Sequence, residues 1–486
     1  MLNPDALLYL NGMGTSASEV TSWSATRIAA AVTSGRTSAV EVLEAHLDRI
    51  DRYNPGLAAV TSRRDDDARR DAAAIDEAVA RGERVGPLAG VPITVKETTD
   101  VRGLATTHGL RAFADRIAAA DAPPVEALRR AGAVIVGHTN MPTLTLTGMH
   151  PRSELFGDTV SPWDPDVTPG GSSGGDAVAV ATGMAAIGLG NDSGGSTRLP
   201  AQLCGVAGLK PTPGRFPADH RIGPADPAPA SALFPVDGPL ARCVADLRTA
   251  FEVLAVADPR DPRAVPAPTS GPQLPRAVGV VRDPGGHGVD PAIANAVDAA
   301  ADALADAGYE VGEVDVPMLD DALAVYTGMV LTEFAGNWPA ISALVGPEAS
   351  RYINFDLDEH PPLDLEQYLE RAARLLTVRR ACAQRAAVTP LLLGPVSTRA
   401  RFAPGQESSS AEEKRRYGRS MALSVWTTAV GAPAVAVPTG LVDGTPVGVQ
   451  VIGPMFREDA VLDAAQAVEN ACGTLTPVEP RAGGRS

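Results

Sequence analysis

Apolar residues near the N-terminus repeat at the spacing of one helix face. After Ser38 the apolar positions fall at i, i+3, i+7 and i+10: Val40, Leu43, Leu47 and Ile50. This period is typical of an amphipathic helix, and Ser38 with Glu41 gives it a capping box. A shorter helix is predicted over 24–33 and another over 64–80. Residues 1–80 are therefore expected to be helices that wrap the core.

Further along, short apolar runs alternate with helical patterns. Residues 91–96, VPITVK, are typical of a buried strand, and a helix over 125–130 leads into a strand at 133–136. The order strand, helix, strand returns later in the chain: 277–281, 290–307 and 309–316. This alternation predicts a parallel sheet covered by helices, with polar loops at the strand ends.

The C-terminal part repeats the strand pattern once more. Strands are predicted at 434–438 and 447–452, joined around Asp443-Gly444, and a closing helix over 459–471. Two segments rich in Gly and Pro, 206–211 and 237–242, are interpreted as loops at the edge of the core.

Length sets the domain organisation. A chain of 486 residues exceeds the usual limit for one core, so either one broad α/β domain with insertions or two lobes is expected. Residues 258–275, rich in Pro, Ala and Asp, are a candidate linker or surface excursion. Residues 319–421 are expected to form a mainly helical insertion near the substrate entrance. We expect this insertion to belong to the domain formed by 81–486.

Composition and charge exclude several classes of function. The net charge of −16 opposes binding to nucleic acid or anionic membranes. The four cysteines lack CxxC spacing and the seven histidines form no HxxxH or HxH pair, so neither a metal nor another cofactor is expected. No signal peptide and no run of 18 apolar residues is found, which favours the cytoplasm. A homodimer is left open.

Two clusters of Gly and Ser stand out, GGSSGG at 170–175 and DSGGS at 192–196. Only one short helix and one strand fit between them. Glycines beside serines let backbone N–H groups turn toward a ligand, so Ser172 and Ser196 are expected in one active site. The alternatives are a phosphate-binding loop and a flexible linker. Neither cluster fits the phosphate-loop patterns, and apolar segments flank both clusters.

Lys96 closes the buried strand at 91–96, where its charge must be paired or lost. One interpretation is a salt bridge with Glu97 or Asp100. The other follows from the serines, since a serine needs a base to become a nucleophile. No His/Asp partner pair is evident, and His138 is expected to be structural. A neutral lysine in a Ser–Lys arrangement would serve as the base.

These residues also carry a resemblance to a known family. The segments GVPITVKE, PGGSSGG, GNDSGGSTR and CGVAGLKPTPGR occur in this order, with 76 residues from Lys96 to Ser172 and 24 from Ser172 to Ser196. In motifs and spacing the chain resembles the amidase signature family. The resemblance extends to the closing PVGVQVIGP and weakens across 319–421.

The resemblance implies an α/β/α fold around a large mixed, mostly parallel sheet, and a Ser–cisSer–Lys triad acting on a small-molecule amide. It makes Ser196 the nucleophile, Ser172 the bridging serine after a cis peptide bond, and Lys96 the base. Ser173 is expected to orient the relay. The resemblance assigns the oxyanion N–H donors to one turn: Ser193, Gly194, Gly195 and Ser196.

The substrate is less well determined by the sequence. Leu146, Met149 and His150 are expected near the acyl pocket, because they lie in the family-like loop before Ser172. The apolar character of this region favours an aryl or aliphatic acyl group. A stand-alone amidase is the favoured function, with esterase side activity left open. The alternatives are the glutaminase-type subunit of a tRNA-dependent amidotransferase and a non-catalytic binding protein on the same fold.

Overall fold

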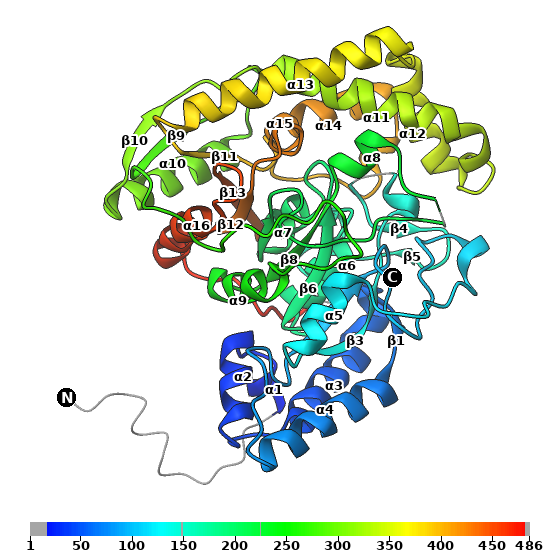
Figure 1. The fold of residues 1–486 in the computed structure, drawn as a ribbon, viewed down its shortest axis with the longest axis vertical. Coiled ribbons are helices and arrows are strands. Elements are labelled where there is room, and N and C mark those ends of the chain that lie inside the picture. The colour runs from blue at the N-terminus through cyan, green and yellow to red at the C-terminus, as the bar shows by residue number, and fades with distance from the viewer. Residues whose placement is uncertain (1–16, 147–148, 224, 482–486) are drawn as a thin grey trace.

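A computed structural model describes residues 17–146, 149–223 and 225–481 of the chain. Residues 1–14, where the sequence predicts no signal peptide, lie outside the described part. A mixed sheet of 11 strands runs through the molecule, and helices pack against it (Figure 1). This arrangement is the α/β/α architecture that the sequence predicts.

The strands of the large sheet lie side by side in this order: β1 (Val60–Arg63), β3 (Val134–Thr139), β2 (Pro92–Lys96), β6 (Ile187–Asp192), β8 (Val236–Ala241), β7 (Ala207–Lys210), β12 (Ala434–Val442), β13 (Thr445–Ile452), β11 (Leu391–Pro395), β9 (Ala277–Val280) and β10 (Glu310–Glu313). A separate two-stranded sheet joins β4 (Arg152–Ser153) to β5 (Gly157–Asp158).

The directions of the strands differ from the expected mostly parallel sheet. β2 runs parallel to β3 and β6, and β9 runs parallel to β10 and β11. Between these two blocks, from β6 through β8, β7, β12 and β13 to β11, every neighbouring pair is antiparallel. The sheet is therefore mixed but not mostly parallel. The segments interpreted as edge loops, 206–211 and 237–242, form much of this centre as β7 and β8. Their Gly and Pro residues hide the strand pattern although both strands are buried.

The helices are, in chain order: α1 (Ala17–Val20), α2 (Ala25–Thr33), α3 (Ala39–Leu57), α4 (Asp65–Ala80), α5 (Pro123–Arg130), α6 (Gly174–Ala181), α7 (Arg198–Cys204), α8 (Pro229–Leu233), α9 (Val244–Leu254), α10 (Pro291–Asp306), α11 (Leu319–Ile341), α12 (Pro347–Glu359), α13 (Leu365–Ala386), α14 (Ala411–Ser420), α15 (Ala422–Val430) and α16 (Glu458–Cys472). Among them α6 packs on α7, while α16 packs on both α9 and α10.

The N-terminal helices begin where their caps predict. The Ser24 side chain accepts a hydrogen bond from the Arg27 N–H, and Ser38 forms a complete capping box with Glu41. The expectation that 1–80 holds only helices is wrong in one respect, because β1 follows α3 and pairs with β3. A four-residue strand with one buried position carries too little pattern to be recognised from sequence.

Residues 319–421 are mainly helical, as expected, and α11 to α14 lie together at the top of Figure 1. The segment also contains β11, which lies between β13 and β9 inside the large sheet. It is therefore not purely an insertion over one face. Residues 258–275 form a mostly exposed, irregular stretch between α9 and β9, which confirms the surface excursion.

No helix in the described ranges combines the length and apolar character needed to cross a bilayer. Within the same ranges, no three His, Cys, Asp or Glu residues are grouped as metal ligands would be. All four cysteines are free thiols, and Cys204 is buried in the core.

Candidate active site

Lys96 ends β2 with its side chain wholly buried. Its Nζ donates a hydrogen bond of 2.6 Å to Ser172 Oγ and lies 3.4 Å from the carbonyl oxygen of Asn191. Glu97 instead accepts a hydrogen bond from the Thr107 hydroxyl, and no ion pair found in the described part of the chain includes Lys96. The salt-bridge interpretation of Lys96 is therefore wrong, and the lysine faces a serine.

Burial sets the protonation of this lysine. The loss of hydration lowers the pKa of Lys96 to about 8, against the opposing effect of the Asp176, Asp192 and Asp237 carboxylates. Asp176 is itself wholly buried, and burial raises its pKa to about 7. A lysine that loses its proton near neutral pH can accept one from a hydroxyl group.

Ser172 lies in the loop that leads into α6. The Gly171–Ser172 peptide bond is cis, as the family resemblance implies. Ser173 follows as the residue before α6, and its hydroxyl lies 3.2 Å from both the N–H and the carbonyl oxygen of Asn191. A Cβ on Gly190 would lie 2.7 Å from this hydroxyl, so only glycine fits at that position. The Ser173 hydroxyl thus fixes this loop to the end of β6.

Ser196 lies on the turn after β6, close to the Ser172 loop. The Ser173 N–H donates to the Ser196 carbonyl oxygen at 3.0 Å. Ser196 is half-buried, whereas Ser172 and Lys96 are buried, so of these three residues Ser196 is the one that solvent and substrate can reach. Among the hydrogen bonds of the described residues, none joins the Ser196 hydroxyl to the Ser172 hydroxyl. Catalytic hydrogen bonds are often long before substrate binds.

A carboxylate organises the turn from Ser193 to Ser196. Asp192 Oδ1 accepts hydrogen bonds from the N–H groups of Gly194 (3.2 Å) and Gly195 (2.8 Å). These two predicted oxyanion donors therefore have an acceptor inside the protein. For the other two predicted donors, the N–H groups of Ser193 and Ser196, no acceptor is found among the described residues. Gly195 has φ +121°, a conformation that favours glycine.

Asp192 itself is held by Arg198, a pairing that sequence reasoning missed. Both side chains are fully buried, with Arg198 Nε 3.0 Å from Oδ2 and Nη2 3.0 Å from Oδ1. Burial alone would raise the pKa of Asp192, but the Arg198 guanidinium group, together with the hydrogen bonds that the carboxylate accepts, holds this pKa well below its usual range. Arg198 Nη1 also donates to Gln450 Oε1 at 2.8 Å. The sequence motif DSGGSTR places these charges six residues apart but does not show that they meet.

The predicted pocket residues occupy different surroundings. Leu146 is half-buried and packs against an apolar cluster of Leu110, Val345 and Ala349, to which residues of α11 also contribute. Met149 is 0% exposed and part of the main core. It therefore lines no open pocket in this structure. His150 is buried with Nδ1 3.0 Å from the Thr168 hydroxyl, and Nε2 lies 3.4 Å from Asp158.

Other residues reach the Ser193–Ser196 turn instead. The hydroxyl group of Tyr326, on α11, donates to the Ser193 carbonyl oxygen. Met421 and Val425 lie close to the positions that side chains on Gly195 and Gly194 would take. All three come from chain far from the turn in sequence, and no local pattern marks them.

His138 and a surface cavity lie outside this arrangement. Burial lowers the pKa of His138 to about 4, and its ring nitrogens lie 3.2 and 3.1 Å from the carbonyl oxygens of Ala105 and Thr99. These contacts confirm a structural histidine.

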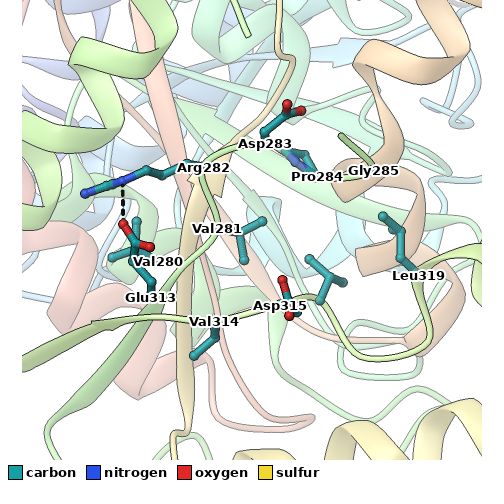
Figure 2. Close-up of a pocket in the computed structure, with 11 residues that line it drawn as sticks. Val280, Val281, Arg282, Asp283, Pro284, Gly285, Glu313, Val314, Asp315 and Leu319 are labelled. Atoms are coloured by element: carbon teal, nitrogen blue, oxygen red, sulfur yellow. Dashed lines mark hydrogen bonds and ion pairs between the residues drawn. The ribbon is translucent and has the colours of Figure 1, made fainter. Parts of the chain in front are cut away.

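A cavity of about 480 Å³ lies at the ends of β9 and β10, where Arg282, Asp283 and Asp315 line it (Figure 2). Lys96, Ser172 and Ser196 are not among the residues that line this cavity.

Comparison with known proteins points to one family. A family model described as Amidase matches residues 41–462. An indoleacetamide hydrolase of Bradyrhizobium diazoefficiens is 40% identical over 458 residues, covering 93% of this chain and 87% of the relative. A glutamyl-tRNA(Gln) amidotransferase subunit of Synechococcus sp. is 33% identical over 477 residues, covering 92% and 96%. The crystal structure of a bacterial aryl acylamidase of the amidase signature family superposes with a TM-score of 0.81 at 27% identity, covering 94% and 97%.

Proposed function

Because this chain belongs to the amidase family and hydrolyses amide C–N bonds, we propose that its substrate is a small primary arylacetamide and its nucleophile Ser196. One observation carries the assignment of roles: the 2.6 Å hydrogen bond from Lys96 Nζ to Ser172 Oγ at a buried site. A lysine held on a serine, next to a second and accessible serine, has the components of a proton relay. Lys96 is the base, Ser172 the relay and Ser196 the attacking group.

The reaction proceeds through an acyl-enzyme. Neutral Lys96 takes the Ser172 proton as Ser172 takes the proton of Ser196, and Ser196 Oγ attacks the amide carbonyl carbon. The proton returns through Ser172 to the leaving nitrogen, the C–N bond breaks, and ammonia departs. Water then attacks the ester on Ser196 by the same relay in reverse, which releases the carboxylic acid and restores the serine.

The oxyanion is stabilised by N–H groups of the turn that holds Ser196. The N–H groups of Ser193 and Ser196 are the donors we assign first, because no protein acceptor occupies them in the described part of the structure. Gly194 and Gly195 contribute if their hydrogen bonds to Asp192 lengthen as substrate binds. Donors fixed before the reaction are worth about 10²–10³ in kcat each.

The arylacetamide class rests on two supports. A relative of 40% identity is an indoleacetamide hydrolase, and the Ser193–Ser196 turn has apolar neighbours. Tyr326 packs against Phe234 with ring centroids 5.0 Å apart, and Met421 lies beside the turn. An aromatic acyl group fits such walls better than a charged one. We assign 319–421 to the same structural domain, with α11 forming one side of the entrance.

Substrate preference tests the proposal. The purified protein is given indole-3-acetamide, phenylacetamide, butyramide and glutamine, and ammonia release is followed. The two arylacetamides should have the highest kcat/KM, and Ser196→Ala should abolish turnover. Preference for glutamine, together with co-purification of a second protein chain, would favour the amidotransferase function instead. Absence of turnover on every amide would favour a non-catalytic protein.

A further inference from the structure

We propose that Tyr326 is a positioning residue for the oxyanion donors, through which α11 sets the geometry of the amide groups beside Ser196. The inference rests on the proposed function, because it assigns a role in the reaction at Ser196. Neither the sequence motifs nor the family resemblance includes this tyrosine.

The contact itself is direct. The Tyr326 hydroxyl donates a hydrogen bond to the carbonyl oxygen of Ser193 and lies 3.5 Å from the Ser193 hydroxyl. The position that a Cβ on Gly194 would occupy is 3.4 Å from the same hydroxyl. The Tyr326 side chain therefore contacts the Ser193–Gly194 peptide, which is the first peptide unit of the turn.

That peptide unit is held at both ends. Its carbonyl group accepts from Tyr326, and its N–H, on Gly194, donates to Asp192 Oδ1 at 3.2 Å. Two partners on opposite sides fix the plane of the Ser193–Gly194 peptide. The plane in turn fixes the direction of the neighbouring N–H groups, which must be aimed at the oxyanion before the reaction begins.

Without the hydroxyl group, the turn has freedom to move. Gly194 has no Cβ, so rotation of the Ser193–Gly194 peptide meets little steric resistance. Small displacements of catalytic groups have large effects on rate, because the donors then no longer match the transition state. Binding of the substrate in the ground state is less sensitive to such displacements than the transition state is, because the carbonyl oxygen of the substrate carries less negative charge.

The tyrosine is itself rigidly placed. Its ring lies 5.0 Å from that of Phe234, and Val325 and Met329 pack in the same apolar cluster. Burial raises the pKa of Tyr326, so its hydroxyl remains a donor throughout the working pH range. The segment 319–421 thereby supplies a group that acts on the turn, beyond any role in covering the entrance.

Tyr326→Phe removes the hydroxyl group and keeps the ring. We expect kcat for an arylacetamide to fall about 10- to 100-fold, less than for deletion of a donor itself, with KM within about twofold of wild type. An aryl trifluoromethyl ketone, which forms a tetrahedral adduct with a serine, reports on the oxyanion site separately. Its Ki should rise by the same factor as kcat/KM falls, while the Kd of the product carboxylate stays unchanged.

Tyr368→Phe is the matched control. Tyr368, on α13, belongs to the same apolar cluster, and its hydroxyl donates to Glu333 Oε1 at 2.6 Å. Removing it deletes a tyrosine hydroxyl from the same helical region without touching the turn. Its kcat and inhibitor Ki should match wild type. Circular dichroism melting of both variants shows that each is folded.

Three results would overturn the inference: unchanged kcat in Tyr326→Phe, a rise in KM alone, or a lower kcat with an unchanged inhibitor Ki. A rise in KM alone would make Tyr326 a substrate contact. These outcomes are separate from failure of the proposed function, which would show in the wild type as absence of arylacetamide turnover. A wild-type enzyme that is active beside an unaffected Tyr326→Phe variant would refute only the role of the tyrosine.

Discussion

Replacing Asp176 with Asn tests the electrostatic setting of Lys96. With the pKa of Lys96 at about 8, about 10% of the lysine is neutral at pH 7 and about 90% at pH 9. At the ordinary value of 10.5 the neutral fraction at pH 7 would be about 300-fold smaller. If neutral Lys96 is the base, kcat/KM of the wild type should rise about tenfold between pH 7 and pH 9.

Asp176 opposes this shift, because its carboxylate favours the charged lysine. It lies in the first turn of α6 and accepts a hydrogen bond from the Thr94 hydroxyl at 3.0 Å. Asparagine removes the charge and keeps an oxygen for Thr94. The pKa of Lys96 should therefore fall further, by about one unit, the size typical of a nearby opposite charge. The Asp192 and Asp237 carboxylates remain in place.

The assay is ammonia release measured as kcat/KM from pH 6 to pH 10. The rising limb of Asp176→Asn should lie about one unit below that of the wild type, with a similar plateau. Asp219→Asn is the control, because Asp219 is partly exposed and pairs with Arg221. If the pH at which kcat/KM rises were unchanged or higher in Asp176→Asn, the electrostatic reasoning would be refuted. A wild-type kcat/KM that does not change between pH 7 and pH 9 would refute it too.

Three further substitutions test separate parts of the site. Lys96→Ala should lower the acylation rate by several orders of magnitude, with partial recovery at high pH in stopped-flow assays; wild-type rates would remove Lys96 from the mechanism. Ser172→Ala should lose most activity and keep a wild-type melting curve, so near-normal turnover would argue against a serine relay. Asp192→Asn leaves the Arg198 charge buried without its partner and should cost about 3–5 kcal/mol in urea unfolding. Asp463→Asn, at an exposed ion pair, should cost under about 1 kcal/mol, and equal losses in the two variants would contradict the importance of burial.

Much of the fold follows from local patterns. The caps at Ser24 and Ser38, the turn at Asp443-Gly444 and the β9–α10–β10 unit are each specified by neighbouring residues, and all are confirmed. The single helix and strand expected between the two Gly-Ser clusters are α6 and β6. Strands whose evidence is mainly non-local were missed. β7, β8 and β11 are short, contain Gly or Pro, and are fixed by partners distant in the chain.

The active site likewise combines residues that local sequence motifs identify with residues that only the fold brings together. The motifs and their resemblance to the amidase signature family identify Lys96, Ser172 and Ser196 as candidates, and the structure brings Lys96 onto Ser172. The groups that hold the turn could not be predicted. Nothing in the sequence shows that the Arg198 side chain contacts Asp192 across the turn, and Tyr326 lies on α11, far from the turn in sequence. Met149 was misplaced because an apolar residue in a loop near a site can equally belong to the core, and here it does.

Covalent labelling tests the central claim, that Ser196 is the nucleophile, most directly. The wild-type protein is treated with a fluorophosphonate probe, digested, and analysed by mass spectrometry to locate the adduct. We expect one modified residue, Ser196, loss of activity in proportion to labelling, and no labelling of Ser196→Ala. Labelling of Ser196→Ala at the wild-type rate, or an adduct on another serine of the wild type, would contradict this claim.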